Sequence, residues 1–469
     1  MKRNLVLNFN FWRTTSLYGF GFLGLRLISF ILIPIYTNLL TPSDTGVIFI
    51  IYTFLAFLNT LYSRGMDASL FKYFNEKDSS EVVSTSIIYS VKYGACISLL
   101  LTLFFFFCSG SLSLPFENIF ILGLTLVLFC DMISSRCLNI LRLLNRPKYY
   151  IFSCFFSVSI SLILNIYFIN FLKMGLNGAI IAIIFSALFQ FFILSPVFFK
   201  SLNIRFYNSK LLYKMKKTGL PFIPAAVFLI LIELADRWMI GILSPNGTAD
   251  VGLYGSAYKF GSLIMLCVKG FNLNWQPYYL KGYNQVKFYK IGTLFLFFLI
   301  AMATFISLLW PLLFKFLIGP LYWKGGIIIP IISISYVFYG LFILQMPSIY
   351  LKNKENWAPV FWGSGLLVNL ICNYFLIIYI GYYGAAFSTL LSYMTMSFFL
   401  YYKNRKWMPI NYNYNLIVIV FIISMAFVVF QYNFNIGPES NRVYFFSIGF
   451  SFLYLSLMTP FAIYMKNKL

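Results

Sequence analysis

The stretch FLFFLIAMATFISLLWPLLF, residues 295–314, decides the fold class. It contains no charged side chain, and about 20 consecutive apolar residues are enough for one helix to cross the hydrocarbon core of a bilayer. A strand of a transmembrane barrel would instead alternate apolar and polar residues over about ten positions. The stretch therefore predicts a membrane-spanning helix.

The rest of the chain has the same character. Of its 469 residues, 61% are hydrophobic and 10% are charged, whereas soluble domains are about 45–50% apolar and about 25% charged. We therefore expect an all-α polytopic membrane protein. Windows of about 19 residues predict fourteen spans, near 15–39, 45–63, 84–108, 117–138, 150–172, 176–199, 219–243, 251–272, 291–316, 327–350, 357–379, 384–402, 414–431 and 443–465.

The charges give these spans an orientation. The chain has 35 Lys and Arg against 12 Asp and Glu, a formal net charge of +23. A basic soluble protein would suggest nucleic acid, but cytoplasmic loops of membrane proteins retain Lys and Arg. Nearly all basic loop residues fall on one side of the predicted topology, and the other side holds only Lys173, Lys324 and Arg442. We therefore expect both termini in the cytoplasm and no nucleic-acid partner.

The chain contains a weak internal repeat. SDTGVIF around Gly46 and ADVGLYG around Gly252 each open a second span, and GLNGAIIA around Gly178 and GYYGAAFS around Gly384 each open a sixth, at the same separation. Copies with an even number of spans share one orientation, a parallel repeat used by alternating-access transporters. We predict an N-lobe with a cytoplasmic connector, a C-lobe and an extra helix pair, at 1–218, 219–412 and 413–469.

Several ionisable residues fall inside the predicted spans, where a charge costs at least about 2.5–3.5 kcal/mol. Such residues tend to face a partner or a watery cavity. The candidates for substrate binding or transport are Arg26, Glu233, Asp236, Arg237, Lys259 and Lys269. Arg26 lies near the middle of its span, whereas Lys269 lies near a span end, where its ammonium can snorkel to the interface.

Two interpretations of these charges stay open. Glu233 and Asp236 share one helix face with Arg237, so either acid could pair with Arg237 or Lys259 to lock helices together. Alternatively, the cations line a cavity that receives an anionic headgroup, with the carboxylates tuning the site or binding a coupling cation. A separate acid, Asp131, could pair with Arg136 about one turn further on.

Several kinds of chemistry find no support in the sequence. There is no histidine, no phosphate-binding GxxxxGK[ST] loop and no GxSxG or HExxH motif. The seven cysteines fall in apolar runs without metal-ligand spacing. The predicted outer loops are too short for a catalytic domain. We therefore expect no enzyme, no metal and no cofactor, apart from a possible coupling Na⁺ or H⁺.

A family resemblance rests on several motifs in order. The first half has a Leu-Thr-Pro-x-x-x-Gly turn at 40–46 and a Gly-x-Asp segment that begins an amphipathic stretch at 65–74. The second half has Gly-Leu-Pro at 219–221, the Asp236–Arg237 pair and a Gly-x-Tyr-x-x-Ala-x-Lys run at 252–259. This order resembles Wzx-type polysaccharide repeat-unit flippases for O-antigen or capsule, in the multidrug/oligosaccharidyl-lipid/polysaccharide (MOP) exporter superfamily.

The resemblance implies two six-helix lobes like those of multidrug and toxic compound extrusion (MATE) transporters. It implies export of an undecaprenyl-diphosphate-linked oligosaccharide across the bacterial cytoplasmic (inner) membrane, in contact with polysaccharide polymerase machinery. Arg26 and Lys259 would bind the headgroup, and Asp236 with Arg237 would form a cavity or gating pair. A peptidoglycan-precursor flippase, a cation-coupled drug exporter and a membrane polysaccharide polymerase remain as alternatives.

Overall fold

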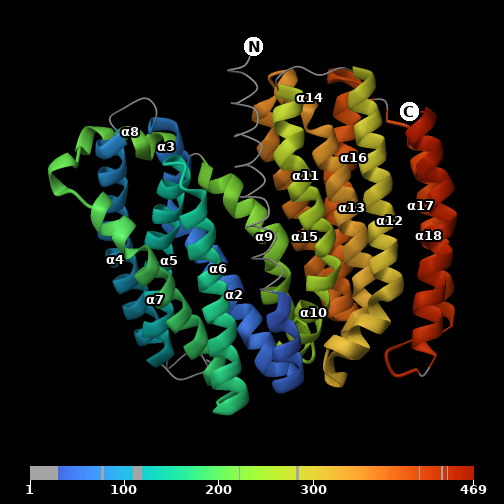
Figure 1. Ribbon diagram of the computed structural model, residues 1–469, viewed down its shortest axis with the longest axis horizontal. Coiled ribbons are helices and arrows are strands. Elements are labelled where there is room, and N and C mark those ends of the chain that lie inside the picture. The colour runs from blue at the N-terminus through green and yellow to red at the C-terminus, as the bar shows by residue number, and fades with distance from the viewer. Residues whose placement is uncertain are drawn as a thin grey trace. The chain divides into compact units, whose positions relative to one another are not determined.

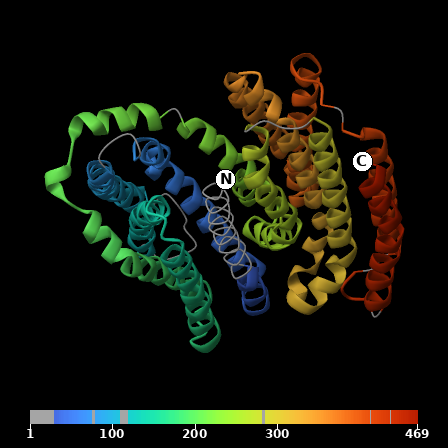
Figure 2. The same cartoon turned by 45° about the horizontal axis from the view of Figure 1, so that its top comes forward.

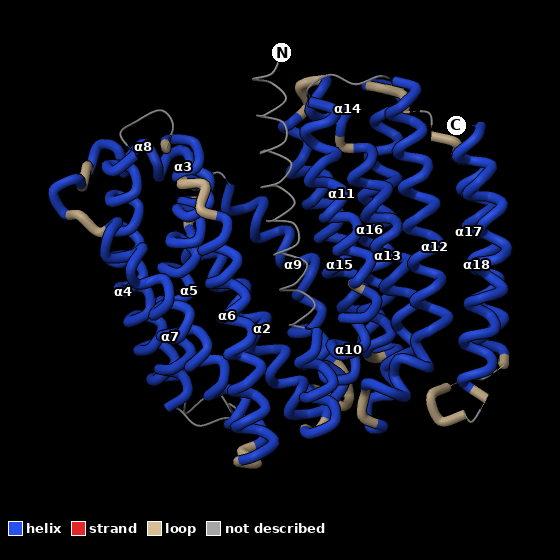
Figure 3. Tube along the Cα trace, in the orientation of Figure 1, coloured by secondary structure: helices blue, strands red, loops and turns tan. Residues whose placement is uncertain are grey.

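The computed structural model describes residues 30–74, 79–108, 119–220, 222–280, 285–410, 412–434, 437–440 and 442–468. Throughout these ranges the regular secondary structure is helical, as Figure 3 shows. The prediction of an all-α membrane protein is confirmed.

Within the described residues, each predicted span coincides with a helical segment. Ten helices are long and apolar enough to cross a membrane, and a bent pair brings the number to 11 among the described residues. Two further helices are also long: α9, Phe222–Leu243, whose sequence includes three charged residues, and α16, Tyr382–Trp407. The first predicted span is described only from residue 30, as the apolar helix Phe30–Leu39.

One predicted span is broken. Hydropathy predicts one straight helix over residues 251–272, but α10, Thr248–Gly261, and α11, Leu263–Leu280, meet at an angle of 45°. Ser262 lies at the break, and its backbone N–H bonds to the carbonyl of Tyr258 at 2.8 Å. The two helices together remain apolar enough for one span, so hydropathy gives no sign of the bend, whereas the Gly261–Ser262 pair at the break is a common cause of helix kinks.

The chain divides into two compact units. Unit 1 comprises residues 1–40 and 50–230, and unit 2 comprises residues 41–49 and 231–469. Two helices contribute to both units: α2, Pro42–Ser63, and α9.

Unit 1 is a bundle built around α5, which packs against α4 and α7, with α6 against α7 (Figure 1). A π-helical turn, η1, continues α6, and an amphipathic helix, α8, follows α7. Its elements besides parts of α2 and α9 are α3 Met66–Tyr73, α4 Ser79–Cys108, α5 Ile119–Leu143, α6 Pro147–Asn165, η1 Ile166–Phe171, α7 Gly175–Ser201, η2 Ile204–Phe206 and α8 Ser209–Gly219.

Unit 2 is built around α13, which packs against α12 and α16, with α15 against α16. The predicted extra pair, α17 and α18, packs along α12, as Figure 2 also shows. The elements besides α10 and α11 are α12 Gln285–Leu317, η3 Pro320–Ile328, α13 Ile329–Gln345, α14 Pro347–Leu351, η4 Glu355–Trp357, α15 Ala358–Ile380, α16, α17 Tyr414–Asn433 and α18 Val443–Lys468.

Two of the repeat glycines meet inside unit 2. A Cβ atom on Gly46 of α2 would lie 1.8 Å from the carbonyl oxygen of Thr248, and one on Gly252 of α10 would lie 2.0 Å from that of Pro42. Beside this crossing, the hydroxyls of Ser43 and Thr248 lie 2.7 Å apart. The glycines allow two helix backbones to approach without side chains between them.

Candidate functional site

The charged turn of α9 is buried in unit 2. The Arg237 guanidinium donates from Nη1 to the carbonyl oxygen of Glu233 at 3.0 Å and forms an ion pair with Asp236 at 3.4 Å. Both partners are almost inaccessible, with Asp236 at 0% and Arg237 at 5% exposure. This is one of the intramembrane pairs that the sequence allowed, and it neutralises a charge that would otherwise be costly in this environment.

Tyrosines surround this pair. The Tyr254 hydroxyl donates to the Asp236 carboxylate, and the Arg237 guanidinium carbon lies 4.7 Å from the centre of the Tyr258 ring. The hydroxyl of Tyr258 in turn contacts that of Tyr336. The motif at 252–259 contains Tyr254, but it does not indicate the whole shell, because the residues come from α9, α10 and α13 and meet only in the folded chain.

The second acid of the turn has a different partner. Glu233 accepts from the Lys269 ammonium at 2.9 Å, and the two side chains are 24% and 33% exposed. The predicted partners of Glu233 are Arg237 and Lys259; Arg237 contacts only the backbone of Glu233 in the interactions described above. The ion pair between Lys269 and Glu233 therefore joins α11 to α9.

Two predicted cations remain, Lys259 and Arg26. Lys259 is half-buried on α10, next to Tyr258, and its carbonyl accepts from the Ser262 hydroxyl at 2.9 Å. Arg26 lies outside the described residues. The structure thus brings together Glu233, Arg237 and Lys269 with Asp236, while the headgroup role of Arg26 and Lys259 stays a prediction.

Unit 1 contains a second polar cluster. Arg136 of α5 is 1% exposed and pairs with Asp67 of α3. It also donates to the Ser63 carbonyl at 2.9 Å and to the Ser90 hydroxyl at 3.2 Å. Asp67 accepts a further bond from the Asn139 amide.

The predicted pairing of Asp131 with Arg136 is wrong. Asp131 instead accepts from the Asn59 amide at 3.1 Å. Residues five apart on an α-helix point about 140° away from each other, so their side chains do not share a face. The missed signal is Asp67 in the Gly-x-Asp motif, which supplies the carboxylate that Arg136 needs.

Two of the motifs touch each other in unit 1. Gly65 has a left-handed φ of 66°, and a Cβ atom there would lie 2.0 Å from the carbonyl oxygen of Gly219. The positive φ and the close approach both require glycine. The motif glycines therefore hold the start of α3 against the end of α8, and with it Asp67.

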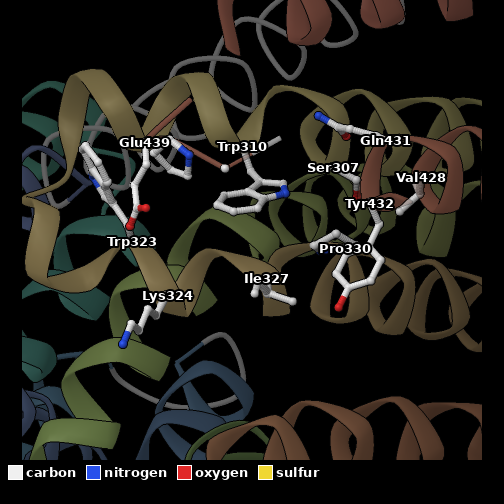
Figure 4. Close-up of a pocket in the computed structure, with 12 residues that line it drawn as sticks. Ser307, Trp310, Trp323, Lys324, Ile327, Pro330, Val428, Gln431, Tyr432 and Glu439 are labelled. Carbon is white, nitrogen blue, oxygen red and sulfur yellow. The ribbon is translucent and has the colours of Figure 1, made fainter. Parts of the chain in front are cut away.

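A pocket lies in unit 2, between α12, η3, the end of α17 and residues 437–439 (Figure 4). It has a volume of about 300 Å³, and Trp310, Trp323 and Tyr432 are among the residues that line it. None of the predicted site residues lines this pocket.

The sequence matches the model of the family described as polysaccharide biosynthesis protein over residues 11–282, more than half of the chain. The chain belongs to the polysaccharide biosynthesis protein family. A comparison with curated proteins found no match.

Solved structures extend the likeness to nearly the whole chain. The lipid II flippase MurJ, in an inward closed conformation, matches with a TM-score of 0.72 and 14% identity, over 96% of this chain and 100% of that one. An inward-facing MATE family multidrug resistance transporter of the MOP superfamily matches with a TM-score of 0.64 and 11% identity, over 87% and 96%. A mutant of the Vibrio cholerae MATE transporter VcmN gives 0.55 and 17%, over 87% and 98%.

At these identities the likeness shows a shared fold and assigns no substrate. Together with the family match, it confirms the expected resemblance to the superfamily. It leaves open which group of flippases or exporters the chain resembles most in function.

Proposed function

We propose that the chain is a flippase, not an enzyme, that moves undecaprenyl-diphosphate-linked oligosaccharide repeat units across the bacterial cytoplasmic membrane by alternating access. The product would be an O-antigen or capsular polysaccharide. The observation that carries the proposal is the match to the polysaccharide biosynthesis family on a fold shared with a lipid II flippase. Both termini would be cytoplasmic, and a polymerase would take over the exported unit.

The charges of unit 2 suit this task. A diphosphate brings negative charge into a low-dielectric slab, and a fixed cation lowers that barrier. Lys269 is the more accessible cation beside α9, whereas Arg237 is buried and neutralised by Asp236. In the proposal, Arg26, Lys259 and Lys269 attract the diphosphate and the Asp236–Arg237 pair acts as a gate. Na⁺ or H⁺ would be the coupling ion.

A lipid II flippase is the second candidate, because MurJ matches with a higher TM-score than the two MATE transporters described above. Both candidates share a polyprenyl diphosphate and differ in the sugar. For a drug exporter or a polysaccharide polymerase, deletion of the gene would change drug sensitivity or the leaflet in which lipid-linked units accumulate.

Deletion in the native cell tests the proposal. Surface polysaccharide and membrane-extracted lipid-linked oligosaccharide would be measured together, with the leaflet of the latter assigned by an impermeant reagent. We expect loss of polymer and accumulation of single repeat units on the cytoplasmic leaflet. Accumulation of lipid II would support the second candidate. Altered drug sensitivity with intact polymer would support a drug exporter. Accumulation of single repeat units on the outer leaflet would support a polymerase.

A further inference from the structure

Unit 1 contains a cavity of about 550 Å³. Cavities that bind small ligands have about this size. Most of its lining residues carry hydroxyl, amide or charged groups. They are Asn59, Thr60, Ser63, Asp67, Asp131, Met132, Ser135, Arg136, Leu138, Gln190 and Ala226.

Two of the charges in this lining already neutralise each other, Arg136 and Asp67. Arg136 is held by Asp67, by the Ser63 carbonyl and by the Ser90 hydroxyl, as described above. Its guanidinium is 1% exposed and has little capacity left for an anion. Arg136 and its partners therefore form a polar part of the lining whose hydrogen bonds are already made.

Asp131 and Gln190, which also line the cavity, retain hydrogen-bonding capacity. Asp131 uses one oxygen to accept from Asn59 at 3.1 Å, whereas a carboxylate has about four lone-pair sites. Gln190 uses its oxygen to accept from the Ser157 hydroxyl at 3.2 Å, and its amide nitrogen carries two donors. The cavity is thus lined both by a strong acceptor, the Asp131 carboxylate, and by an amide donor, Gln190.

The hydrogen-bonding groups of the lining determine which class of ligand the cavity can bind. A polyprenyl tail would leave the unused acceptor sites of Asp131 and the amide donors of Gln190 without hydrogen bonds, at a cost of about 1–3 kcal/mol for each buried group. A phosphate would meet the carboxylate of Asp131. Within the described residues, no group of three or more His, Cys, Asp or Glu side chains could hold a metal ion. A sugar fits best, because each of its hydroxyls both donates and accepts.

We propose that this cavity binds the glycan of the lipid-linked substrate, with Asp131 accepting from sugar hydroxyls and Gln190 donating to them. The inference rests on the proposed function and adds a glycan site in unit 1 to the diphosphate-binding role proposed above for Arg26, Lys259 and Lys269. In the predicted topology, Arg136 lies at the cytoplasmic end of its span. The cavity would therefore take up the glycan on the loading side.

Binding measurements on the full-length protein in lipid nanodiscs test this assignment. One probe is the lipid-linked oligosaccharide fraction extracted from cells that lack the gene, and the other is undecaprenyl diphosphate without sugar. Asp131→Ala and Gln190→Ala each remove one proposed contact. Glu81→Ala is the matched control, because Glu81 is another unit 1 carboxylate that accepts from an amide, that of Asn208, and it does not line the cavity.

We expect each cavity variant to bind the glycan-carrying lipid about 10- to 100-fold more weakly. Binding of the sugar-free lipid should not change, and Glu81→Ala should bind both probes like the wild type. Equal losses for both probes, or no loss for either, would overturn the glycan site. A wild-type protein that binds both lipids equally well would overturn it too while leaving a flippase possible, whereas binding of neither would overturn the proposed function itself.

Discussion

Gly46 and Gly252 face each other where the first turns of α2 and α10 cross, each against the backbone of the other helix. The two positions are equivalent in the sequence repeat. Gly178 and Gly384, the other repeated pair, each open a long helix as well. A repeat found by spacing alone therefore marks positions where helices begin or pack closely.

The crossing predicts a strong effect of small substitutions. Gly46→Ala places a Cβ atom 1.8 Å from the Thr248 carbonyl oxygen, so the helices must separate, at a cost of about 1–3 kcal/mol or more. A thermal unfolding curve of the purified protein should show a clearly lower melting temperature. Gly363→Ala on α15 is the control, since nothing lies within 4 Å of its Cβ position. Equal melting temperatures for both variants would contradict the close approach.

The Asp67–Arg136 pair predicts an asymmetric response. Asp67→Ala leaves a guanidinium that is 1% exposed without its counter-charge, and such a loss costs about 3–5 kcal/mol. Arg136→Met should cost less, because the remaining Asp67 side chain is 37% exposed and can be hydrated. Comparing both singles with the double variant by thermal unfolding measures the coupling. Arg136→Met being the more damaging change would argue against this explanation.

The two acids of the α9 turn should behave differently. Asp236→Asn leaves the buried Arg237 without a charged partner and should destabilise the protein by several kcal/mol. Glu233→Gln breaks a partly exposed pair with Lys269, for which about 0–1 kcal/mol is expected. Melting temperatures of the two variants provide the test. A similar loss for both would mean that exposure does not govern the cost here.

The proposed headgroup cations predict loss of export without loss of insertion. Arg26→Ala and Lys259→Ala should each abolish polysaccharide export when expressed in a deletion strain, because the diphosphate would lose a compensating charge. Immunoblots of membrane fractions check that the variants are inserted at the wild-type level. Lys214→Ala is the control, since Lys214 is exposed on α8. Normal export by a well-expressed Arg26→Ala variant would remove Arg26 from the proposed site.

Hydropathy was sufficient to predict the helices, because a lipid-facing helix must carry a long apolar run whatever its neighbours are. It could not predict the 45° break after Gly261 or the π-helical turn at Ile166–Phe171, since the average hydropathy of both segments is high enough for an unbroken span. Spacing along one helix placed Glu233 and Arg237 four residues apart, where side chains can meet, but the Arg237 guanidinium pairs with its neighbour Asp236 and contacts only the carbonyl of Glu233. The partners of Glu233 and Arg136, Lys269 and Asp67, come from other helices, so spacing along one helix cannot pair them, although the Gly-x-Asp motif contains Asp67.

Two helices belong to both units, and this sets where strain can be absorbed. The division falls between residues 49 and 50 in α2 and between residues 230 and 231 in α9, and both helices continue through it without a break. A continuous helix resists stretching, so strain at either of these divisions would twist or bend the helix or unwind one of its turns. In α9, the first charged residue beyond the division is Glu233. Twisting of α9 at this point would turn Glu233 relative to its partner Lys269 on α11, so that a mechanical event becomes an electrostatic one.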